Sequence, residues 1–172
     1  MEHSSEREEG AGSAGFFLSR SQLGICGNTN PGMTDIAYRS DFAVEDFLGL
    51  AQRVWPRDHS LRDASAALQR TINIGAWDGS RLVGSVRILT DGYFFATIPD
   101  IFVDPEYERR GIGRRLMELA LERAPRGKVA FGAQPQSVEF FECIGCERKL
   151  TGFVAARPLK APDPSYDRQA VE

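Results

Sequence analysis

The stretch Val103-Asp-Pro-Glu-Tyr-Glu-Arg-Arg-Gly-Ile-Gly113 decides the fold of this chain. A strand pattern ends at Val103, a turn follows, and a helical pattern begins near Gly111. Gly111 and Gly113 have no side chain, so backbone N–H groups at the helix start can come close to an anion. The helix dipole adds partial positive charge, and four arginines surround this point: Arg109, Arg110, Arg114 and Arg115. The pattern predicts a diphosphate site, and a solvated, arginine-rich helix start is the alternative.

Two common nucleotide-binding motifs do not account for this loop. The chain has no G-x-x-x-x-G-K-[ST] sequence, which excludes a P-loop. Leu116 stands at the third glycine position of G-x-G-x-x-G, and the strands before the loop follow an antiparallel pattern rather than a βαβ pattern. A dinucleotide-binding fold is therefore disfavoured.

The strand before the loop, Ala96-Thr-Ile-Pro-Asp-Ile-Phe-Val103, contains a proline. Pro99 has no N–H to donate to a neighbouring strand, so we expect a β-bulge near Pro99–Asp100. Such an opening frees the backbone of Ile101–Val103 to pair with an extended ligand. Asp100, a carboxylate among apolar neighbours, is a candidate proton acceptor. The alternative is a turn aspartate that pairs with an arginine.

The remaining pattern alternates between helical and strand periods. Strands are predicted at Asp35–Tyr38, Ile72–Ala76, Leu82–Ile88, Tyr93–Val103, Lys128–Gly132 and Phe153–Ala156. Helices are predicted at Asp41–Val54, Leu61–Arg70, Gly111–Ala124 and Ser137–Ile144. Asp-Gly turns join the middle three strands into an antiparallel meander. The order indicates an α/β (α+β) fold with a mixed sheet covered by helices.

Composition narrows the class of protein. The 172 residues carry a net charge of -3, with 42% hydrophobic and 26% charged residues, as in a soluble globular domain. A negative chain is not expected to bind nucleic acid, and no apolar run is long enough to span a membrane. Three cysteines make no disulfide framework, which favours the cytoplasm. The lone C-x2-C of Cys143 and Cys146 is interpreted as packing, so no metal is expected.

The ends of the chain differ from its middle. Residues 1–32 are rich in Gly, Ser and Glu and predict a disordered tail, with Met33 as an alternative start. Residues 160–172 also predict a tail. A single folded domain is expected over residues 33–159.

In its motifs and in the order of its strands and helices, the chain resembles the GNAT superfamily of acyl-CoA N-acyltransferases. Ile101-Phe-Val-Asp-Pro-Glu-Tyr-Glu-Arg-Arg-Gly-Ile-Gly-Arg-Arg-Leu116 resembles the cofactor motif of that family, and Ser137-Val-Glu-Phe-Phe-Glu-Cys-Ile-Gly-Cys-Glu147 resembles its second cofactor-flanking helix. The resemblance implies a GNAT-like, mostly antiparallel sheet of six to seven strands with about four helices. Ala96-Thr-Ile-Pro-Asp100 also resembles the serotonin (arylalkylamine) acetyltransferase branch, which points to an amine substrate.

The resemblance also implies where acetyl-CoA binds. Its pantetheine would pair with the backbone of Ile101 and Val103, between that strand and the one at Lys128–Gly132. Its pyrophosphate would meet the N–H groups of Arg109–Arg114. The full set of expected cofactor-binding residues is Ile101, Phe102, Val103, Glu108, Arg109, Arg110, Gly111, Ile112, Gly113, Arg114, Ser137, Phe140 and Phe141.

Two positions depart from the family pattern. Glu108 replaces the usual Gln or Arg, and we expect its carboxylate to face solvent rather than phosphate. Phe141 stands where many members have a tyrosine that protonates the leaving thiolate. We therefore expect the thiolate to leave without a dedicated acid. The alternative is that Phe141 faces the core and another acid, such as Tyr93 or Tyr107, takes the role.

The sequence thus predicts an acetyl-CoA-dependent N-acetyltransferase that acts by direct attack of a small-molecule primary amine. Asp100 would remove the ammonium proton, directly or through water, and the N–H of Ile101 or Phe102 would stabilise the oxyanion. Three alternatives remain: a non-catalytic acyl-CoA-binding module, an enzyme for protein amines, and a tRNA-directed toxin, which the negative charge disfavours. The expected assembly is a monomer or homodimer.

Overall fold

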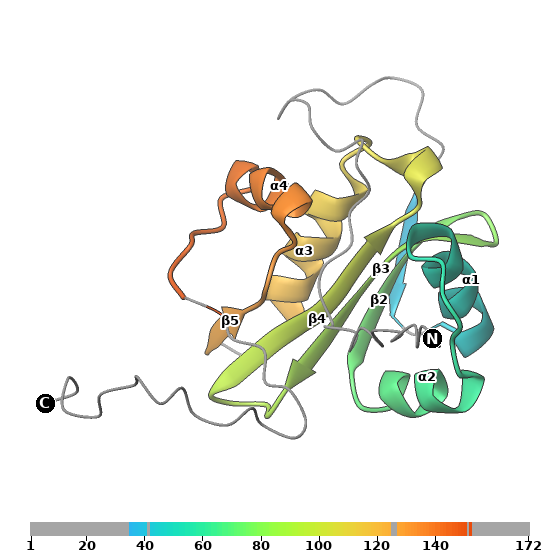
Figure 1. The fold of residues 1–172 in the computed structure, drawn as a ribbon, viewed down its shortest axis with the longest axis horizontal. Coiled ribbons are helices and arrows are strands. Elements are labelled where there is room, and N and C mark those ends of the chain that lie inside the picture. Colours follow the sequence, from blue (N-terminus) through green and yellow to red (C-terminus); the bar gives the residue numbers. More distant parts are fainter. Residues whose placement is uncertain (1–34, 41, 125–126, 151, 153–172) are drawn as a thin grey trace, which may run out of the picture. The chain divides into compact units, whose positions relative to one another are not determined.

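The computed structural model describes residues 35–40, 42–124, 127–150 and 152. Five strands and four α-helices lie within these residues (Figure 1). The strands are β1 (Ala37–Ser40), β2 (Ile72–Asp78), β3 (Arg81–Thr90), β4 (Phe95–Val103) and β5 (Lys128–Ala130). The α-helices are α1 (Val44–Val54), α2 (Leu61–Leu68), α3 (Ile112–Arg123) and α4 (Val138–Cys143). Short 3₁₀ helices, η1 (Pro105–Tyr107) and η2 (Pro135–Ser137), precede α3 and α4.

The strands form one sheet in the order β1-β2-β3-β4-β5. The first four strands are antiparallel and β5 runs parallel to β4, which confirms the predicted mixed, mostly antiparallel sheet. Pairing between β4 and β5 covers only Phe95–Thr97 with Lys128–Ala130. Beyond Thr97, β4 therefore continues without β5 at its side.

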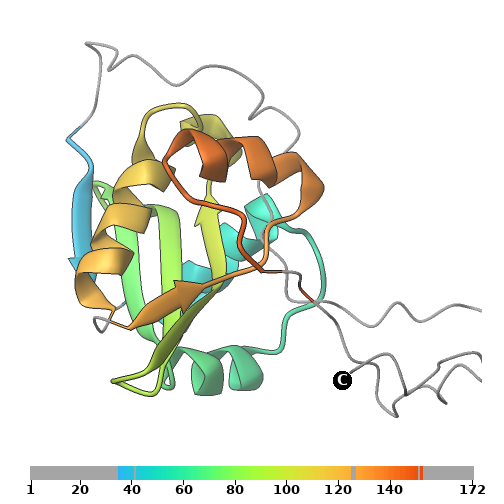
Figure 2. The ribbon, with the colours of Figure 1, turned by 90° about the vertical axis from the view of Figure 1, so that its left-hand side faces the viewer.

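Helices cover both faces of the sheet. Figure 1 shows α3 and α4 on one face and α1 and α2 on the other, and Figure 2 views the sheet from the side of α3, α4 and β5. Each face has its own apolar cluster. The cluster under α3 and α4 is the larger one, and the cluster under α1 and α2 is built around Phe47, Leu50 and Phe102.

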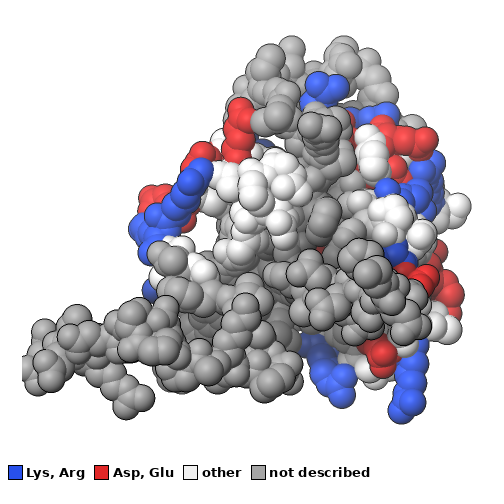
Figure 3. Space-filling model, in the orientation of Figure 1, with Lys and Arg blue, Asp and Glu red and all other residues white. Residues whose placement is uncertain are grey.

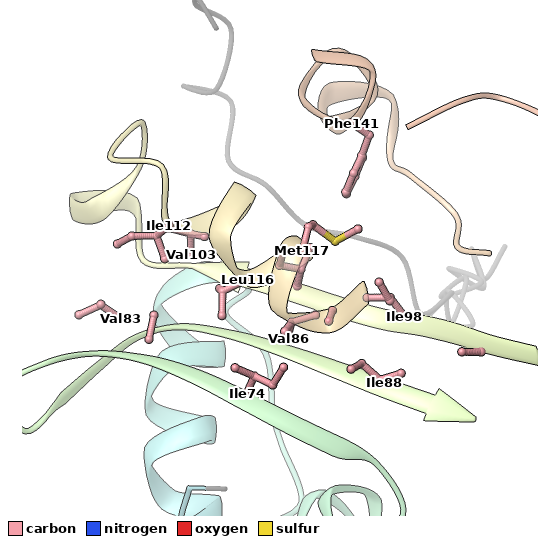
Figure 4. Close-up of a cluster of buried hydrophobic side chains, with 14 residues drawn as sticks. Ile74, Val83, Val86, Ile88, Ile98, Val103, Ile112, Leu116, Met117 and Phe141 are labelled. Atoms are coloured by element: carbon pink, nitrogen blue, oxygen red, sulfur yellow. The ribbon is translucent and has the colours of Figure 1, made fainter. Parts of the chain in front are cut away.

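Helix α3 buries one stripe on the central strands. Ile112, Leu116 and Met117 belong to one buried cluster with side chains of β2, β3 and β4. In Figure 4 Leu116 points toward the strands and Met117 extends toward Phe141 of α4. Gly84 allows this close approach, because a Cβ there would lie 3.0 Å from Ile112 Cγ2 and 3.1 Å from Leu116 Cδ1. The start of α3, and with it the loop before the helix, is thus held against β3 by close packing.

A β-bulge in β4 lies where the sequence predicted it, beside Asp100. Leu89 pairs with Thr97 and Arg87 pairs with Asp100, so two residues of β4 stand opposite one residue of β3. The extra residue reverses the alternation of side chains. Ile98 and Ile101 both face the α3 cluster, while Asp100 lies on the face of α1. Unbroken alternation would have placed the Asp100 carboxylate in the apolar cluster.

Two details differ from the sequence prediction. The described residues contain five strands rather than six to seven, and the strand expected at Phe153–Ala156 lies outside them. Strand β4 begins at Phe95 rather than Tyr93, because Asp91 closes a turn. Its Oδ1 accepts the N–H groups of Tyr93, Phe94 and Phe95 at 2.9, 2.9 and 3.1 Å, which gives these donors a partner outside the sheet.

Asp104 fixes the end of β4 to α1 and β3. It is 1% exposed and its Oδ2 accepts hydrogen bonds from Arg53 Nε at 2.6 Å and Arg81 Nη2 at 2.9 Å. Arg53 also donates to the carbonyl of Leu82 at 2.7 Å. Burial alone would raise the pKa of Asp104, but hydrogen bonds from Arg53, the Glu106 N–H and Arg81 outweigh burial and lower it. The ionised carboxylate therefore stabilises the fold.

We predict that Asp104→Asn lowers the free energy of unfolding by about 2 kcal/mol at pH 7, since hydrogen bonds to charged groups contribute about that much. A lowered folded-state pKa gives stability that is present above the unfolded value, about 3.9, and lost as pH falls through the folded value. Urea unfolding should therefore show a gap between wild type and variant that is widest near neutral pH and narrows below about pH 4. Glu106→Gln, at a carboxylate 69% exposed, is the control and should change stability little. A gap independent of pH would contradict this account.

Candidate functional site

The loop between β4 and α3 leads into a helix whose first N–H groups have no partner within the helix. Gly111 caps α3 and adopts the left-handed conformation, with φ 79°. The backbone N–H of Arg115 donates to the carbonyl of Gly111 at 3.0 Å. The preceding N–H groups, of Ile112, Gly113 and Arg114, have no carbonyl one turn back within the helix. A Cβ built on Gly111 would meet no atom within 4 Å, so the space beside this helix start is open. The geometry suits an anion.

The arginines around the loop are not equivalent. Arg110 lies 4.6 Å from the Tyr107 ring centre and donates to the Glu106 carbonyl at 2.9 Å, so it braces the loop. Arg114 and Arg115 pair with Glu118 at 3.2 and 3.1 Å along the surface of α3. Arg109 makes no ion pair with the described residues. Its backbone φ of 57° is unusual for a residue other than glycine. Its guanidinium remains available to a ligand.

Further contacts hold this loop in place. The Tyr107 hydroxyl donates to Asp78 Oδ2 at 2.7 Å, which ties η1 to the end of β2. This hydrogen bond, more than burial, raises the pKa of Tyr107. Glu108, expected to face solvent, is half-buried.

The backbone of β4 beyond the bulge offers donors toward the side of β5. The Asp104 N–H donates to the Val83 carbonyl of β3 at 2.8 Å. Because N–H groups point alternately to the two edges of a strand, those of Ile101 and Val103 point away from β3. Since β5 pairs only as far as Thr97, these two donors face the opening between the strands.

A cavity of about 410 Å³ lies on the other face of β4, against α1, α2 and their connection. We call it the α1–α2 cavity. Its wall contains three aromatic rings (Phe47, Trp55, Phe102), three carboxylates (Asp58, Asp63, Asp100) and three basic side chains (Arg57, His59, Arg87). Pro99 of the bulge also lines it. The reversed alternation of β4 thus exposes Asp100 to this cavity.

Asp100 forms an ion pair with Arg87. From the sequence, pairing with an arginine is the alternative to a role as proton acceptor. Arg87 Nε donates to Oδ1 at 3.0 Å and to Oδ2 at 2.9 Å, and its Nη2 also contacts Oδ2. The two side chains are 11% and 15% exposed, and the guanidinium lies 5.3 Å from the Phe47 ring centre. The pair is nearly buried and its charges balance, so Asp100 has a fixed position in the cavity wall.

Comparison with known proteins decides the family. The family model described as Acetyltransferase (GNAT) family matches residues 38–146. That span is more than half of the chain, and it includes the cavity, the bulge and the loop. The chain belongs to the GNAT family. The predicted family and fold class are therefore confirmed.

Individual relatives agree with this assignment. The GNAT chain is 32% identical over 134 residues to "GCN5-related N-acetyltransferase 2, chloroplastic" of Arabidopsis thaliana, across 63% of this chain and 52% of the relative. It is 31% identical over 128 residues to "Histone acetyltransferase TAP1" of Glycine max, across 65% and 55%. The chain thus spans about half the length of the curated relatives it matches. A GNAT family protein of Streptococcus pneumoniae superposes with a TM-score of 0.58 at 28% identity, over 70% of this chain and 97% of that one.

The two phenylalanines of α4, both expected to bind the cofactor, have different surroundings. Phe141 is 4% exposed and belongs to the α3 cluster, as Figure 4 shows for its ring near Met117. Phe140 lies beside the loop, since a Cβ on Gly113 would come within 3.1 Å of its Cζ. Ser137 is fully buried and its hydroxyl has no hydrogen-bond partner among the described residues. Phe141 therefore faces the core, as in the alternative reading.

The tyrosines proposed as replacement acids do not fit that role. Tyr93 is 73% exposed at the tip of the β3–β4 hairpin, and the Tyr107 hydroxyl already donates to Asp78. No tyrosine is among the described residues that line the α1–α2 cavity. Neither Tyr93 nor Tyr107 is therefore assigned the role of the acid.

Sequence reasoning missed Arg87 and His59. Arg87 interrupts the apolar pattern of β3, which was the available signal, but its partner depends on the bulge in β4. His59 lies in an irregular connection and carried no local pattern. Within the described residues, no group of three or more His, Cys, Asp or Glu side chains could hold a metal ion, and no helix is long and apolar enough to cross a membrane.

Arg109 provides a test of the loop geometry that needs no ligand. Glycine adopts φ near 57° without steric cost, so we predict that Arg109→Gly raises the free energy of unfolding by about 0.5–1 kcal/mol. This is the relief of left-handed strain less the added entropy of the unfolded chain. Arg109→Ala, the matched control, removes the same charge but keeps the strain. Equal stability of the two variants in urea unfolding would show that the backbone at Arg109 is not strained.

Proposed function

We propose that this GNAT protein is an acetyltransferase that moves an acetyl group from acetyl-CoA to a primary amine of a small molecule in the α1–α2 cavity. The observation that carries the proposal is the position of the bulge. Ile101 and Val103 direct their N–H groups to one edge of β4, and Asp100 lines the cavity on one face. The acyl group and the acceptor can therefore meet at a single strand.

The residues present fit acetyl-CoA. Its diphosphate would bind the N–H groups of Ile112, Gly113 and Arg114 beside the Arg109 guanidinium, in the open space next to Gly111. Its pantetheine would pair with Ile101 and Val103 along the opening beside β5. Phe140, near the helix start, would contact its flank. An aminoglycoside N-acetyltransferase with the same fold, TM-score 0.57 at 19% identity, has been solved in complex with CoA, which supports CoA as the kind of ligand. When bound, acetyl-CoA would supply the activated acyl carbon.

The chain's own groups would act around that carbon. The backbone N–H of Ile101 would donate to the developing oxyanion. Phe102, the other residue considered from the sequence, directs its N–H toward β3, because it pairs with Ser85 in the same register in which Asp104 donates to Val83. The Asp100 carboxylate would attract the ammonium group of the acceptor and accept its proton, directly or through water. Among the described residues we assign no side-chain acid to the departing sulfur. At pH 7 this costs only about 2 kcal/mol, because an unperturbed thiol has a pKa of about 8.5.

The cavity favours a small acceptor. A volume of about 410 Å³ lies within the usual range of small-molecule pockets, about 300–1,000 Å³. Three carboxylates in its wall suit a cationic amine, and aromatic rings suit an apolar body. The name of the soybean relative, "Histone acetyltransferase TAP1", favours a protein amine as the second candidate. A histone peptide therefore belongs in any test of substrates.

Surface charge supports a partner other than nucleic acid. The net charge is -3, and among the coloured residues of the face in Figure 3, which leaves out the grey ones, Lys and Arg lie interspersed with Asp and Glu. Proteins that bind nucleic acid without base recognition need a continuous basic area. A location in the cytoplasm and a monomeric or homodimeric state stay predictions from the sequence.

Calorimetry and a CoA-release assay test the proposal together. We predict that acetyl-CoA binds and that Arg109→Ala weakens binding by about tenfold or more, since charge-assisted contacts contribute about 1.5–3 kcal/mol. Arg123→Ala, at the far end of α3, is the control and should bind normally. Release of CoA should require an amine from a panel that includes a histone peptide. Binding without amine-dependent release would favour the non-catalytic module, and absence of binding would end the acetyltransferase proposal.

For Asp100 we predict that Asp100→Asn lowers kcat by about 10²–10⁴-fold and leaves the affinity for acetyl-CoA nearly unchanged. The amide keeps the size of the side chain but removes the charge that faces the amine. Thermal unfolding must accompany the assay, because the change also leaves Arg87 without its anion. A folded variant with the wild-type rate between pH 6 and 9 would exclude Asp100 from the reaction.

A further inference from the structure

The guanidinium group of Arg87 has hydrogen-bond donors that Asp100 does not use. Asp100 accepts hydrogen bonds from Nε at 3.0 and 2.9 Å and from Nη2. Since a guanidinium carries five N–H groups, this side-on contact leaves both N–H groups of Nη1 and one of Nη2. Nη1 makes no hydrogen bond to a residue that the structure describes, and it is not among the buried side-chain atoms without a partner. Nη1 is therefore accessible.

The sheet determines where this atom is accessible. Arg87 lies in β3 between Asn73 of β2 and Asp100 of β4, and its guanidinium lies 5.3 Å from the Phe47 ring centre of α1. Its side chain thus leaves the sheet on the face of α1, where it lines the α1–α2 cavity. Asn73 does not take the remaining donors, because its Oδ1 already accepts the Thr71 hydroxyl at 2.7 Å. The 15% of the Arg87 side chain that is exposed faces this cavity.

Asp100 also keeps part of its hydrogen-bonding capacity. An ionised carboxylate has about four lone-pair positions on its two oxygens, and the Asp100 side chain is 11% exposed in the wall of the same cavity. The ion pair therefore presents an acceptor and a donor next to each other. A plain ammonium group would use only the acceptor. A ligand with an oxygen close to its nitrogen would use both.

The charges of the cavity wall favour a neutral oxygen. The wall has two guanidinium groups, of Arg57 and Arg87, and three carboxylates, of Asp58, Asp63 and Asp100. Because Asp100 already balances the charge of Arg87, a carboxylate on the ligand would gain little from that arginine. It would also be repelled by the acids of the wall. A hydroxyl oxygen accepts the same hydrogen bond without this repulsion.

We propose that the acceptor is an amino alcohol, whose ammonium group binds to Asp100 and whose hydroxyl oxygen accepts a hydrogen bond from the free N–H groups of Arg87. Arg87 is then a specificity-determining residue. This substrate class rests on the proposed acetyl transfer and narrows it.

Only the nitrogen is acetylated in this reaction. The ammonium group loses one proton to Asp100, directly or through water, and Asp100 later returns it to solvent. The neutral nitrogen bonds to the thioester carbon, the C–S bond breaks, and the sulfur leaves with the electron pair. The second proton of the nitrogen passes to the thiolate. The hydroxyl keeps its proton, since its oxygen serves only as the acceptor for Arg87.

The experiment compares 2-amino-1-phenylethanol with 2-phenylethylamine, two amines that differ only in a hydroxyl. We expect kcat/KM for acetyl transfer to be about ten- to hundredfold higher for the amino alcohol, as for a hydrogen bond to a charged group. Arg87→Lys keeps a cation beside Asp100 but removes the planar group with its second set of donors, so this ratio should fall to about one. Arg62→Lys, the same exchange at an exposed position of α2 outside the cavity, should keep the wild-type ratio. A ratio within one variant cancels any general loss of activity.

A second pair of probes tests the charge of the oxygen. Phenylalaninol and phenylalanine differ in a hydroxymethyl group against a carboxylate, and we expect the alcohol to react faster. A preference for phenylalanine would overturn the neutral oxygen.

The outcomes separate this substrate class from the function on which it rests. A wild-type chain that acetylates none of the probes and no histone peptide overturns the acetyl transfer, and the amino alcohol with it. An active wild type with equal kcat/KM for the first two probes overturns the amino alcohol alone, and this result does not depend on the folding of a variant. A hydroxyl preference that persists in Arg87→Lys overturns the role of Arg87.

Discussion

The extra residue at the bulge of β4 is the constraint on which the rest of the site depends. Side chains of a strand alternate with a strict period of two, so one inserted residue exchanges the two faces for everything that follows. Because the insertion falls before Asp100, the carboxylate lies outside the apolar cluster under α3 and contacts Arg87 at the α1–α2 cavity. Ile101 and Val103 take its place in that cluster. Pro99 has no N–H group, so the interruption of the ladder at this residue costs no hydrogen bond from its nitrogen.

The same strand connects the two halves of the site. Its edge faces the opening beside β5, its face borders the cavity, and its end leads into the loop before α3. Asp104 fixes that end to α1 and β3 through two arginines, while Tyr107 ties the loop to β2. The helix start that would hold the diphosphate and the wall that would hold the amine are thus parts of one rigid framework. Packing of α3 over Gly84 completes it.

Local patterns predicted much of this architecture. The order of elements, the antiparallel meander and the bulge followed from periodicity and from Pro99, because these signals lie within a few residues. The glycines and arginines of the loop also predict an anion site, which stays a prediction. By contrast, Arg87 could not be paired with Asp100 from sequence, since the contact depends on register across two strands. His59 entered the cavity wall only through the tertiary position of an irregular connection, and Phe141 was assigned to the cofactor although its ring faces the core.

Amide hydrogen exchange, measured residue by residue with and without CoA, tests the central claim most directly. The account places the cofactor on one edge of β4 and on the helix start beyond it. CoA should therefore slow exchange at Ile101, Val103 and the N–H groups of Ile112–Arg114, and leave α2 nearly unchanged. Protection confined to α1 and α2, with none at β4 or the start of α3, would contradict the account.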